Sequence, residues 1–195
     1  MEQATMDTKQ TELLIESRLP LRYRERFKTA QGDGPWLQAG QDIYDRLGRG
    51  SLIALIGKSG VGKTQIGANL IYSVIKNHRW PCRYVTAMDF FLLIKASYHR
   101  DSPDTEEMVL SNFAKPILLI IDEYEKRAET QWEDRLLDHL INKRYGLMKE
   151  TILISNSNQE SLETMLGPAN VSRMNESGML VVCDWKSFRE GGQCG

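Results

Sequence analysis

One short segment constrains the fold of this chain more than any other. An apolar run at residues 52–56 leads directly into Gly-Lys-Ser-Gly-Val-Gly-Lys-Thr at residues 57–64, which satisfies the phosphate-loop pattern G-x-x-x-x-G-K-[S/T]. A strand, a glycine-rich turn and a helix over residues 64–77 are expected in that order. In this arrangement the N–H groups of the turn surround phosphate oxygens, and the helix N-terminus adds partial positive charge. The segment therefore predicts a nucleoside triphosphate site.

The loop and the start of the helix supply the expected nucleotide contacts. Lys63 is expected to reach the outer phosphates and to act in catalysis, and the Thr64 hydroxyl is expected to ligate Mg²⁺. The residues predicted to contact the nucleotide are Gly57, Lys58, Ser59, Gly60, Val61, Gly62, Lys63, Thr64 and Gln65.

Length and composition indicate an ordinary globular protein. The chain has 195 residues, 41% hydrophobic and 26% charged, with a formal net charge of −1. Contact with nucleic acid would therefore need a local basic or aromatic surface. The longest apolar runs are about a quarter of a membrane span, and the three cysteines fit neither a disulfide framework nor a metal motif. We expect a cytoplasmic protein with no membrane partner.

Strand-like and helical segments alternate along the chain. Strands are predicted at residues 52–56, 82–86, 117–121, 151–155 and 179–183, and helices at residues 36–47, 64–77, 88–98, 105–112, 130–145 and 159–166. This alternation predicts an α/β fold with a parallel sheet, helices on both faces and the ligand at the carboxyl ends of the strands. Residues 1–18 are expected to be a flexible arm with at most a helical turn, residues 19–189 the catalytic domain and residues 190–195 a tail.

Residues 19–27 combine basic and aromatic side chains, among them Tyr23 and Phe27. Two interpretations are equally open. The segment is either a solvated connector whose rings pack on the edge of the domain, or it lies beside the nucleotide and helps to hold the base.

A second motif ends the most apolar of the predicted strands. Residues 117–121 are followed by Asp122, which is placed to hold Mg²⁺ directly or through water, and by Glu123, which is placed to deprotonate an attacking water. Alone, an apolar strand ending in Asp-Glu usually marks only a strand exit. Beside a phosphate loop, the pair favours hydrolysis over transfer to a bound acceptor.

Three more residues are candidates for the same site. Asn156 follows the predicted strand at 151–155, and its amide suits a hydrogen bond to the γ-phosphate or the attacking water, although Asn is also ordinary in turns. Arg173 and Arg189 carry the planar, permanent charge that neutralises a transferred phosphoryl group. Most arginines are solvated surface residues, so their spacing alone proves little.

Taken in order, these motifs resemble those of the AAA+ ATPases of the DnaC/DnaI helicase-loader and IstB-like group. The resemblance covers residues 19–189 and includes Ile-Ile-Asp-Glu, Asn-Lys-Arg-Tyr, Ile-Ser-Asn-Ser-Asn, Val-Ser-Arg-Met and Asp-Trp-Lys-Ser-Phe-Arg. By this resemblance residues 57–64 are Walker A, Asp122 and Glu123 are Walker B, Asn156 is sensor 1, Arg173 is an arginine finger acting on ATP in a neighbouring subunit, and Arg189 is the sensor 2 arginine.

The resemblance also implies ATP with Mg²⁺, a three-layer P-loop fold of the AAA+/ASCE type with a five-stranded sheet of order 5-1-4-3-2, assembly into a ring or helical row, and binding of single-stranded DNA. Two departures are evident. Barely 18 residues precede the ATPase domain, where loaders usually carry a helicase-binding domain, and six follow Arg189. We therefore expect no helical lid domain. A helicase would be held through another surface, such as residues 13–15, or the chain serves another client.

Two places pair an aromatic ring with polar or basic neighbours, as a stacking surface for unpaired bases would. The first contains Tyr98 and Arg100, and the second contains Thr130 and Trp132. Half-buried packing positions for both rings are an equally good interpretation.

The leading hypothesis is a DNA-dependent ATPase that assembles on single-stranded DNA and loads a replicative helicase. A transposition helper ATPase, and a regulatory module that holds nucleotide and occupies a helicase without turnover, are the alternatives.

Overall fold

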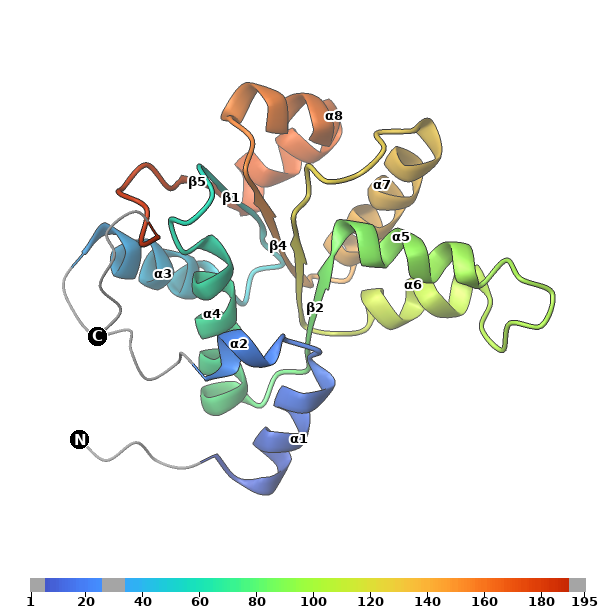
Figure 1. Ribbon diagram of the computed structural model, residues 1–195, viewed down its shortest axis with the longest axis horizontal. Helices are drawn as coiled ribbons and strands as arrows, with labels where there is room; N and C mark the ends of the chain where they lie inside the picture. The colour runs from blue at the N-terminus through green and yellow to red at the C-terminus, as the bar shows by residue number, and fades with distance from the viewer. Residues whose placement is uncertain (1–5, 26–33, 190–195) are drawn as a thin grey trace.

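The computed structural model describes residues 6–25 and 34–189, which form a parallel sheet between two layers of helices (Figure 1). The sheet has five strands in the order β2-β3-β4-β1-β5, and every neighbouring pair is parallel. Written from the other edge, this is the predicted order 5-1-4-3-2, so the predicted fold is confirmed. The strands are β1 (Leu52–Ile56), β2 (Cys82–Thr86), β3 (Leu118–Asp122), β4 (Glu150–Ser155) and β5 (Met179–Val182).

Eight helices are assigned within the described residues, and most lie close to the predicted positions. They are α1 (Thr8–Glu16), α2 (Leu21–Arg24), α3 (Pro35–Arg46), α4 (Lys63–His78), α5 (Ala87–Ala96), α6 (Glu106–Ala114), α7 (Gln131–Gly146) and α8 (Gln159–Ser177).

Alternate side chains of the central strands enter different cores. In β1, Leu52, Ala54 and Ile56 pack with residues of α5, α6, α7 and α8. Ile53 and Leu55 of the same strand pack on the other face, with residues of α1, α3 and α4. Because both faces are covered, the strand is apolar at every position rather than at every second one. This is the three-layer arrangement that the sequence predicts, and Figure 1 shows the two groups of helices on either side of the sheet.

The N-termini of the helices fall into two groups, with and without a side-chain cap. Thr86, Thr105, Thr130 and Asn158 cap α5, α6, α7 and α8, each by accepting a hydrogen bond from a backbone N–H of the first turn. Helix α4 begins after Gly62 with no side-chain cap. Its first N–H groups are therefore left for another partner, as an anion site at a helix N-terminus requires.

Residues 7–17 differ from the expected flexible arm, because they are packed against the domain. Asp7 and Gln10 form a capping box, and the Gln10 side chain donates a 2.8 Å hydrogen bond to the carbonyl of Lys76 in α4. Leu13 is buried, whereas Ile15 stays exposed. The backbone N–H of Tyr84 in β2 also donates to the carbonyl of Ser17 at 2.7 Å. A single apolar helix face, rather than a free patch at 13–15, anchors the segment. Residues 1–5 lie outside the described residues.

Helix α8 also differs from the prediction, which ended it at residue 166. The chain leaves helical geometry at Gly167 (φ 71°, ψ 162°) and resumes it from Pro168 to Ser177. Proline is favoured at the first position of a helix, so the Gly-Pro pair ends one helix and starts the next. The second half carries Arg173.

After β5 the chain turns back over the loop that follows β1, and within the described residues no helix follows β5. The predicted tail at 190–195 lies outside the described residues. In the described part of the chain, none of the helices combines the length and apolar character needed to cross a bilayer.

Candidate nucleotide site at the carboxyl ends of the strands

The loop after β1 has a backbone that only glycine tolerates at two points. Gly57 has φ 140°, and a Cβ there would lie 2.3 Å from the carbonyl oxygen of Cys183. Gly62 has φ 84°, and a Cβ there would lie 2.5 Å from Nε1 of Trp36. Positive φ and close neighbours together exclude other residues. The glycines of the phosphate-loop pattern are thus required by this local geometry.

Carbonyl groups of this loop are held from outside by N–H donors from two distant segments. The indole Nε1 of Trp185 donates to Val61 O at 2.8 Å, and that of Trp36 donates to Gly62 O at 3.1 Å. The backbone N–H of Phe188 donates to Gly60 O at 3.0 Å. With these carbonyls bonded outward, the loop is supported in one conformation while its inner N–H groups remain for a ligand. Sequence reasoning assigned no role to Trp36 or Trp185.

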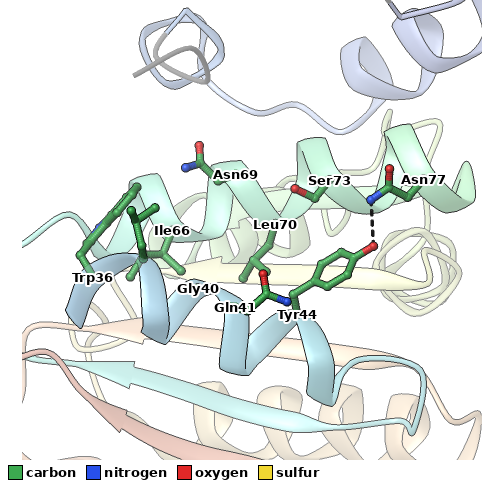
Figure 2. Close-up of a pocket in the computed structure, with 10 residues that line it drawn as sticks. Trp36, Gly40, Gln41, Tyr44, Ile66, Asn69, Leu70, Ser73 and Asn77 are labelled. Carbon is green, nitrogen blue, oxygen red and sulfur yellow. Dashed lines mark hydrogen bonds between the residues drawn. The ribbon is translucent and has the colours of Figure 1, made fainter. Parts of the chain in front are cut away.

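Trp36 also lines a pocket of about 290 Å³ between α3 and α4. Figure 2 shows its ring at one end and Tyr44 at the other, where the Tyr44 hydroxyl accepts a 2.9 Å hydrogen bond from Asn77. The lining side chains come from the two helices. The pocket therefore lies beside the loop rather than within it.

Lys63 is buried, and its ammonium group donates hydrogen bonds to three neutral oxygens. Nζ donates to Gly57 O at 2.6 Å, Lys58 O at 2.9 Å and Oδ1 of Asn156 at 2.9 Å. Burial lowers the pKa of Lys63, and the nearby Asp122 carboxylate acts in the opposite direction. A phosphate oxygen would be a stronger, charge-assisted partner than any of the three neutral acceptors.

Thr64 and Asp122 join the start of α4 to the end of β3. Thr64 Oγ1 donates to Asp122 Oδ2 at 2.8 Å, the Tyr84 hydroxyl donates to the same oxygen at 2.8 Å, and the N–H of Glu123 donates to Oδ1 at 2.7 Å. Asp122 is buried, which raises its pKa, while the hydrogen bonds from Thr64 and Tyr84 oppose this effect.

An adjacent hydroxyl and carboxylate are the hard oxygen ligands that Mg²⁺ prefers. Among residues 6–25 and 34–189, no three His, Cys, Asp or Glu side chains group closely enough to hold a metal. Thr64 and Asp122 therefore fit a magnesium ion whose remaining ligands come from phosphate and water, as is usual for this ion.

Glu123 lies next to this pair in a left-handed backbone conformation (φ 53°). Its Oε1 forms a 2.6 Å ion pair with Nζ of Lys126, and both side chains are about half exposed. Exposed ion pairs contribute little to stability because solvent screens them, so the carboxylate can leave Lys126 at little cost.

Asn156 is brought to the site at the end of β4, where its Oδ1 meets Lys63. Its Nδ2 donates to Oε1 of Glu125 at 2.6 Å, and Ser155 Oγ donates to Oε2 of Glu125 at 3.0 Å. Burial alone would raise the pKa of Glu125, but hydrogen bonds from the backbone and from these two residues outweigh it and lower the pKa. Sequence reasoning missed Glu125, whose only signal is its position shortly after the Asp-Glu pair.

Gln65 and the two arginines are placed differently from one another. The Gln65 side chain donates to Tyr23 O at 3.3 Å and Asn69 Oδ1 at 3.0 Å, so it faces α2 and its own helix rather than the loop. Tyr23 packs against the core, as in the first interpretation of residues 19–27, whereas Phe27 lies outside the described residues.

Arg189 Nη1 lies 3.4 Å from Ser59 Oγ, at the loop.

Arg173 is not brought to this site. It donates to Oδ1 of Asn170 at 2.8 Å and to Oδ1 of Asn142, and its guanidinium lies 5.5 Å from the centre of the Tyr145 ring. These contacts are with α7 and α8.

The two predicted aromatic places form one surface. The rings of Tyr98 and Trp132 meet edge to face with centroids 6.2 Å apart, and Lys95 Nζ lies 5.4 Å from the centre of the Trp132 ring. Tyr98 is 53% exposed, and Arg100 and Thr130 are exposed as well. Thr130 also caps α7 by accepting from the N–H of Glu133 at 3.3 Å. We call Lys95, Tyr98, Arg100, Thr130 and Trp132 the aromatic surface.

The sheet order, the uncapped helix after the glycine loop and the acidic pair at the end of β3 define a P-loop ATPase fold of the AAA+ class. The model of the family described as IstB-like ATP binding protein matches residues 46–175. The chain belongs to this family of ATP-binding proteins.

Known proteins support the same assignment. The replicative helicase loader DnaC of Escherichia coli K12 is 27% identical over 134 residues, covering 68% of this chain and 54% of DnaC. The uncharacterized protein YdaV of the same strain is 29% identical over 155 residues, covering 78% and 61%. The chain thus spans about half the length of the DnaC relatives it matches.

Solved structures show the same fold. A crystal structure of the DnaC helicase loader superimposes with a TM-score of 0.71 at 18% identity, covering 84% of this chain and 99% of that one. The replication initiator DnaA, in a structure with AMPPCP and single-stranded DNA, gives 0.67 at 22% identity, covering 87% and 52%.

Proposed function

We propose that this chain binds ATP with Mg²⁺, hydrolyses it in response to single-stranded DNA and delivers a replicative helicase. The observation that carries the ATPase part is the convergence at one end of the sheet of Lys63, Thr64, Asp122, Glu123 and Asn156. They come from α4, the end of β3 and the end of β4, so the fold rather than local sequence brings them together.

Each residue has a separate role in the proposal. Lys63 exchanges its neutral acceptors for phosphate oxygens. Thr64 and Asp122 hold Mg²⁺, which neutralises charge on the phosphates when bound. Glu123 leaves Lys126 and accepts the proton of the attacking water, and Asn156 bonds to the γ-phosphate or that water.

Two arginines complete the proposed site. Arg189 is close enough to the loop to act on nucleotide bound to its own chain. Arg173 contacts α7 and α8 instead, and in the proposal it acts on ATP bound by a neighbouring subunit of a ring or helical row. Hydrolysis would then depend on protein concentration, because a single chain lacks the arginine from its neighbour.

The proposed DNA contact is the aromatic surface. An exposed tyrosine beside a tryptophan, with Lys95 and Arg100 nearby, offers both stacking and phosphate contacts to unpaired bases. The helicase is proposed from the match to DnaC, which is named a replicative helicase loader. The chain matches about half of DnaC, so the surface that holds a helicase is left open.

A transposition helper ATPase is the second candidate, because the matching family model is the IstB-like one. Such a helper would prefer duplex DNA, whereas a loader would prefer single strands. A regulatory module without turnover is the third possibility, and it would bind nucleotide without hydrolysing it.

Measuring phosphate release from ATP under four conditions separates these functions. The conditions are the protein alone, the protein with single-stranded DNA, with duplex DNA of equal length, and with a replicative helicase. Stimulation by single-stranded DNA together with nucleotide-dependent capture of the helicase supports the loader. Stimulation by duplex DNA alone supports the transposition helper. Nucleotide binding without phosphate release under any condition contradicts the proposed enzyme.

A further inference from the structure

We propose that Glu125 is a positioning residue that orients the Asn156 side-chain amide toward Lys63, and so sets the preference of the site for a triphosphate over a diphosphate. The inference rests on the proposed function, because it concerns the same nucleotide site. No motif identified in the sequence includes Glu125.

The chemistry of the two side chains fixes the amide orientation. An ionised carboxylate only accepts hydrogen bonds, whereas the asparagine amide donates from nitrogen and accepts at oxygen. Glu125 Oε1 lies 2.6 Å from Nδ2 of Asn156, which therefore is the donor. The amide oxygen must then face the other way, where Lys63 Nζ donates to it at 2.9 Å. Without Glu125, of this pair only the hydrogen bond from Lys63 orients the amide, and a phosphate oxygen would replace Asn156 in that bond.

Glu125 itself is held firmly. Its Oε2 accepts a 3.0 Å hydrogen bond from Oγ of Ser155, which is buried at the end of β4. The preceding residue, Tyr124, is 1% exposed, and its N–H donates to Ile154 O at 2.9 Å. One carboxylate oxygen and the adjacent backbone are thus attached to β4. Asn156 is exposed, so its own surroundings do not fix its orientation in the same way.

The contact with Glu125 matters when a phosphate oxygen replaces Asn156 as the hydrogen-bond acceptor of Lys63. The Nδ2–Glu125 bond still holds the amide in place, which leaves one N–H of Asn156 and its oxygen at defined positions next to the outer phosphates. A diphosphate places nothing there. Losing Glu125 is therefore expected to weaken binding of a triphosphate more than binding of a diphosphate.

The test compares Glu125→Ala, Glu125→Gln, Asn156→Ala and the double alanine variant in the full chain. The probes are fluorescent mant-AMPPNP and mant-ADP with Mg²⁺, and the quantity measured is the ratio of their Kd values. Glu125→Ala is expected to reduce the triphosphate preference about fivefold to tenfold, on the scale of one ordinary hydrogen bond. The double variant should lose no more than Asn156→Ala, because both act through one contact.

Glu125→Gln is the conservative variant, since its Oε1 can still accept from Asn156 Nδ2. It should keep the ratio within about twofold of wild type. Glu160→Ala, at an exposed carboxylate of α8, is the matched control and should change nothing. In protein without nucleotide, the ¹⁵N–¹H resonances of the Asn156 side chain should shift in Glu125→Ala and much less in Glu125→Gln.

Three results would overturn the inference. They are an unchanged Kd ratio in Glu125→Ala, an equal loss of affinity for both probes, and additive losses in the double variant. If Glu125→Ala does not fold, a Glu125→Gln variant that loses the preference would also contradict it. Wild-type protein that binds neither probe would instead refute the proposed function, and this inference with it.

Discussion

The hydroxyl of Thr64, at the start of α4, donates a 2.8 Å hydrogen bond to Oδ2 of Asp122, at the end of β3. This bond connects the end of the phosphate loop directly to the acidic end of β3. The same carboxylate oxygen accepts a second hydrogen bond from the Tyr84 hydroxyl at 2.8 Å. Tyr84 is on β2, so side chains from α4, β2 and β3 meet at one oxygen atom.

Tyr84→Phe is expected to lower the free energy of unfolding by about 1–3 kcal/mol, because a buried carboxylate loses one of its donors. Urea denaturation monitored by circular dichroism measures this change. Tyr44→Phe is the control, since its hydroxyl bonds to Asn77 in an exposed setting, and we expect a loss below about 0.5 kcal/mol. Equal losses in the two variants would show that the Tyr84 contact has no special weight.

Trp185→Phe should weaken nucleotide binding without removing the aromatic packing. The variant loses the N–H that donates to Val61 O at 2.8 Å, one of the contacts that hold the phosphate loop in shape. We expect a rise of about threefold to tenfold in the Kd for mant-ATP, corresponding to about one hydrogen bond.

Trp80→Phe serves as the matched control, because Trp80 packs on His78 near the end of α4, away from the loop. Its Kd should stay within about twofold of wild type. A wild-type Kd in Trp185→Phe would mean that the loop keeps its conformation without this donor.

Cys183 should resist alkylation at neutral pH. Burial raises the pKa of its thiol to about 11, with Lys63 acting in the opposite direction, and the residue is 2% exposed. The folded state therefore keeps the thiol proton to a higher pH than the unfolded state. At pH 8 the thiolate is roughly one part in a thousand.

Iodoacetamide labelling followed by peptide mass spectrometry checks this in a Cys194→Ser background. Labelling of Cys183 should be negligible at pH 8, should increase towards pH 10 to 11, and should become rapid in urea. Rapid labelling of the native protein at pH 7 would contradict the buried position beside Gly57.

The nucleotide site was predictable where its residues lie next to each other in the sequence. The phosphate loop and the Asp122-Glu123 pair are local motifs, and a parallel sheet necessarily brings strand ends together, which also placed Asn156. The sheet order followed from the resemblance to a known group, and the structure confirms it.

Other features depend on contacts that no local pattern reveals. Trp36 lies 26 positions before Gly62, and only the packing of α3 on α4 aims its indole at that carbonyl. In the sequence, Glu125 cannot be told from a surface carboxylate. Its hydrogen bonds with Ser155 and Asn156 become evident only in the structure. Arg144 is fully buried, and it donates to main-chain oxygens such as Phe113 O at 2.8 Å.

The packed segment at residues 7–17 was missed for a related reason. Its sequence is mostly polar, and a short amphipathic helix gains stability mainly from the surface on which it packs. Leu13 supplies much of that contact, and a single leucine is not distinctive in a sequence.

The most direct test of the proposed enzyme compares Glu123→Gln with wild type in two measurements, binding of mant-ATP and DNA-stimulated phosphate release. Glu129→Gln, at an exposed carboxylate of the same connection, is the control. We predict that Glu123→Gln binds mant-ATP within about threefold of wild type, while its phosphate release falls by at least about 100-fold, as loss of a general base implies. Phosphate release at the wild-type rate would contradict the assignment of Glu123 and the hydrolytic site built around it.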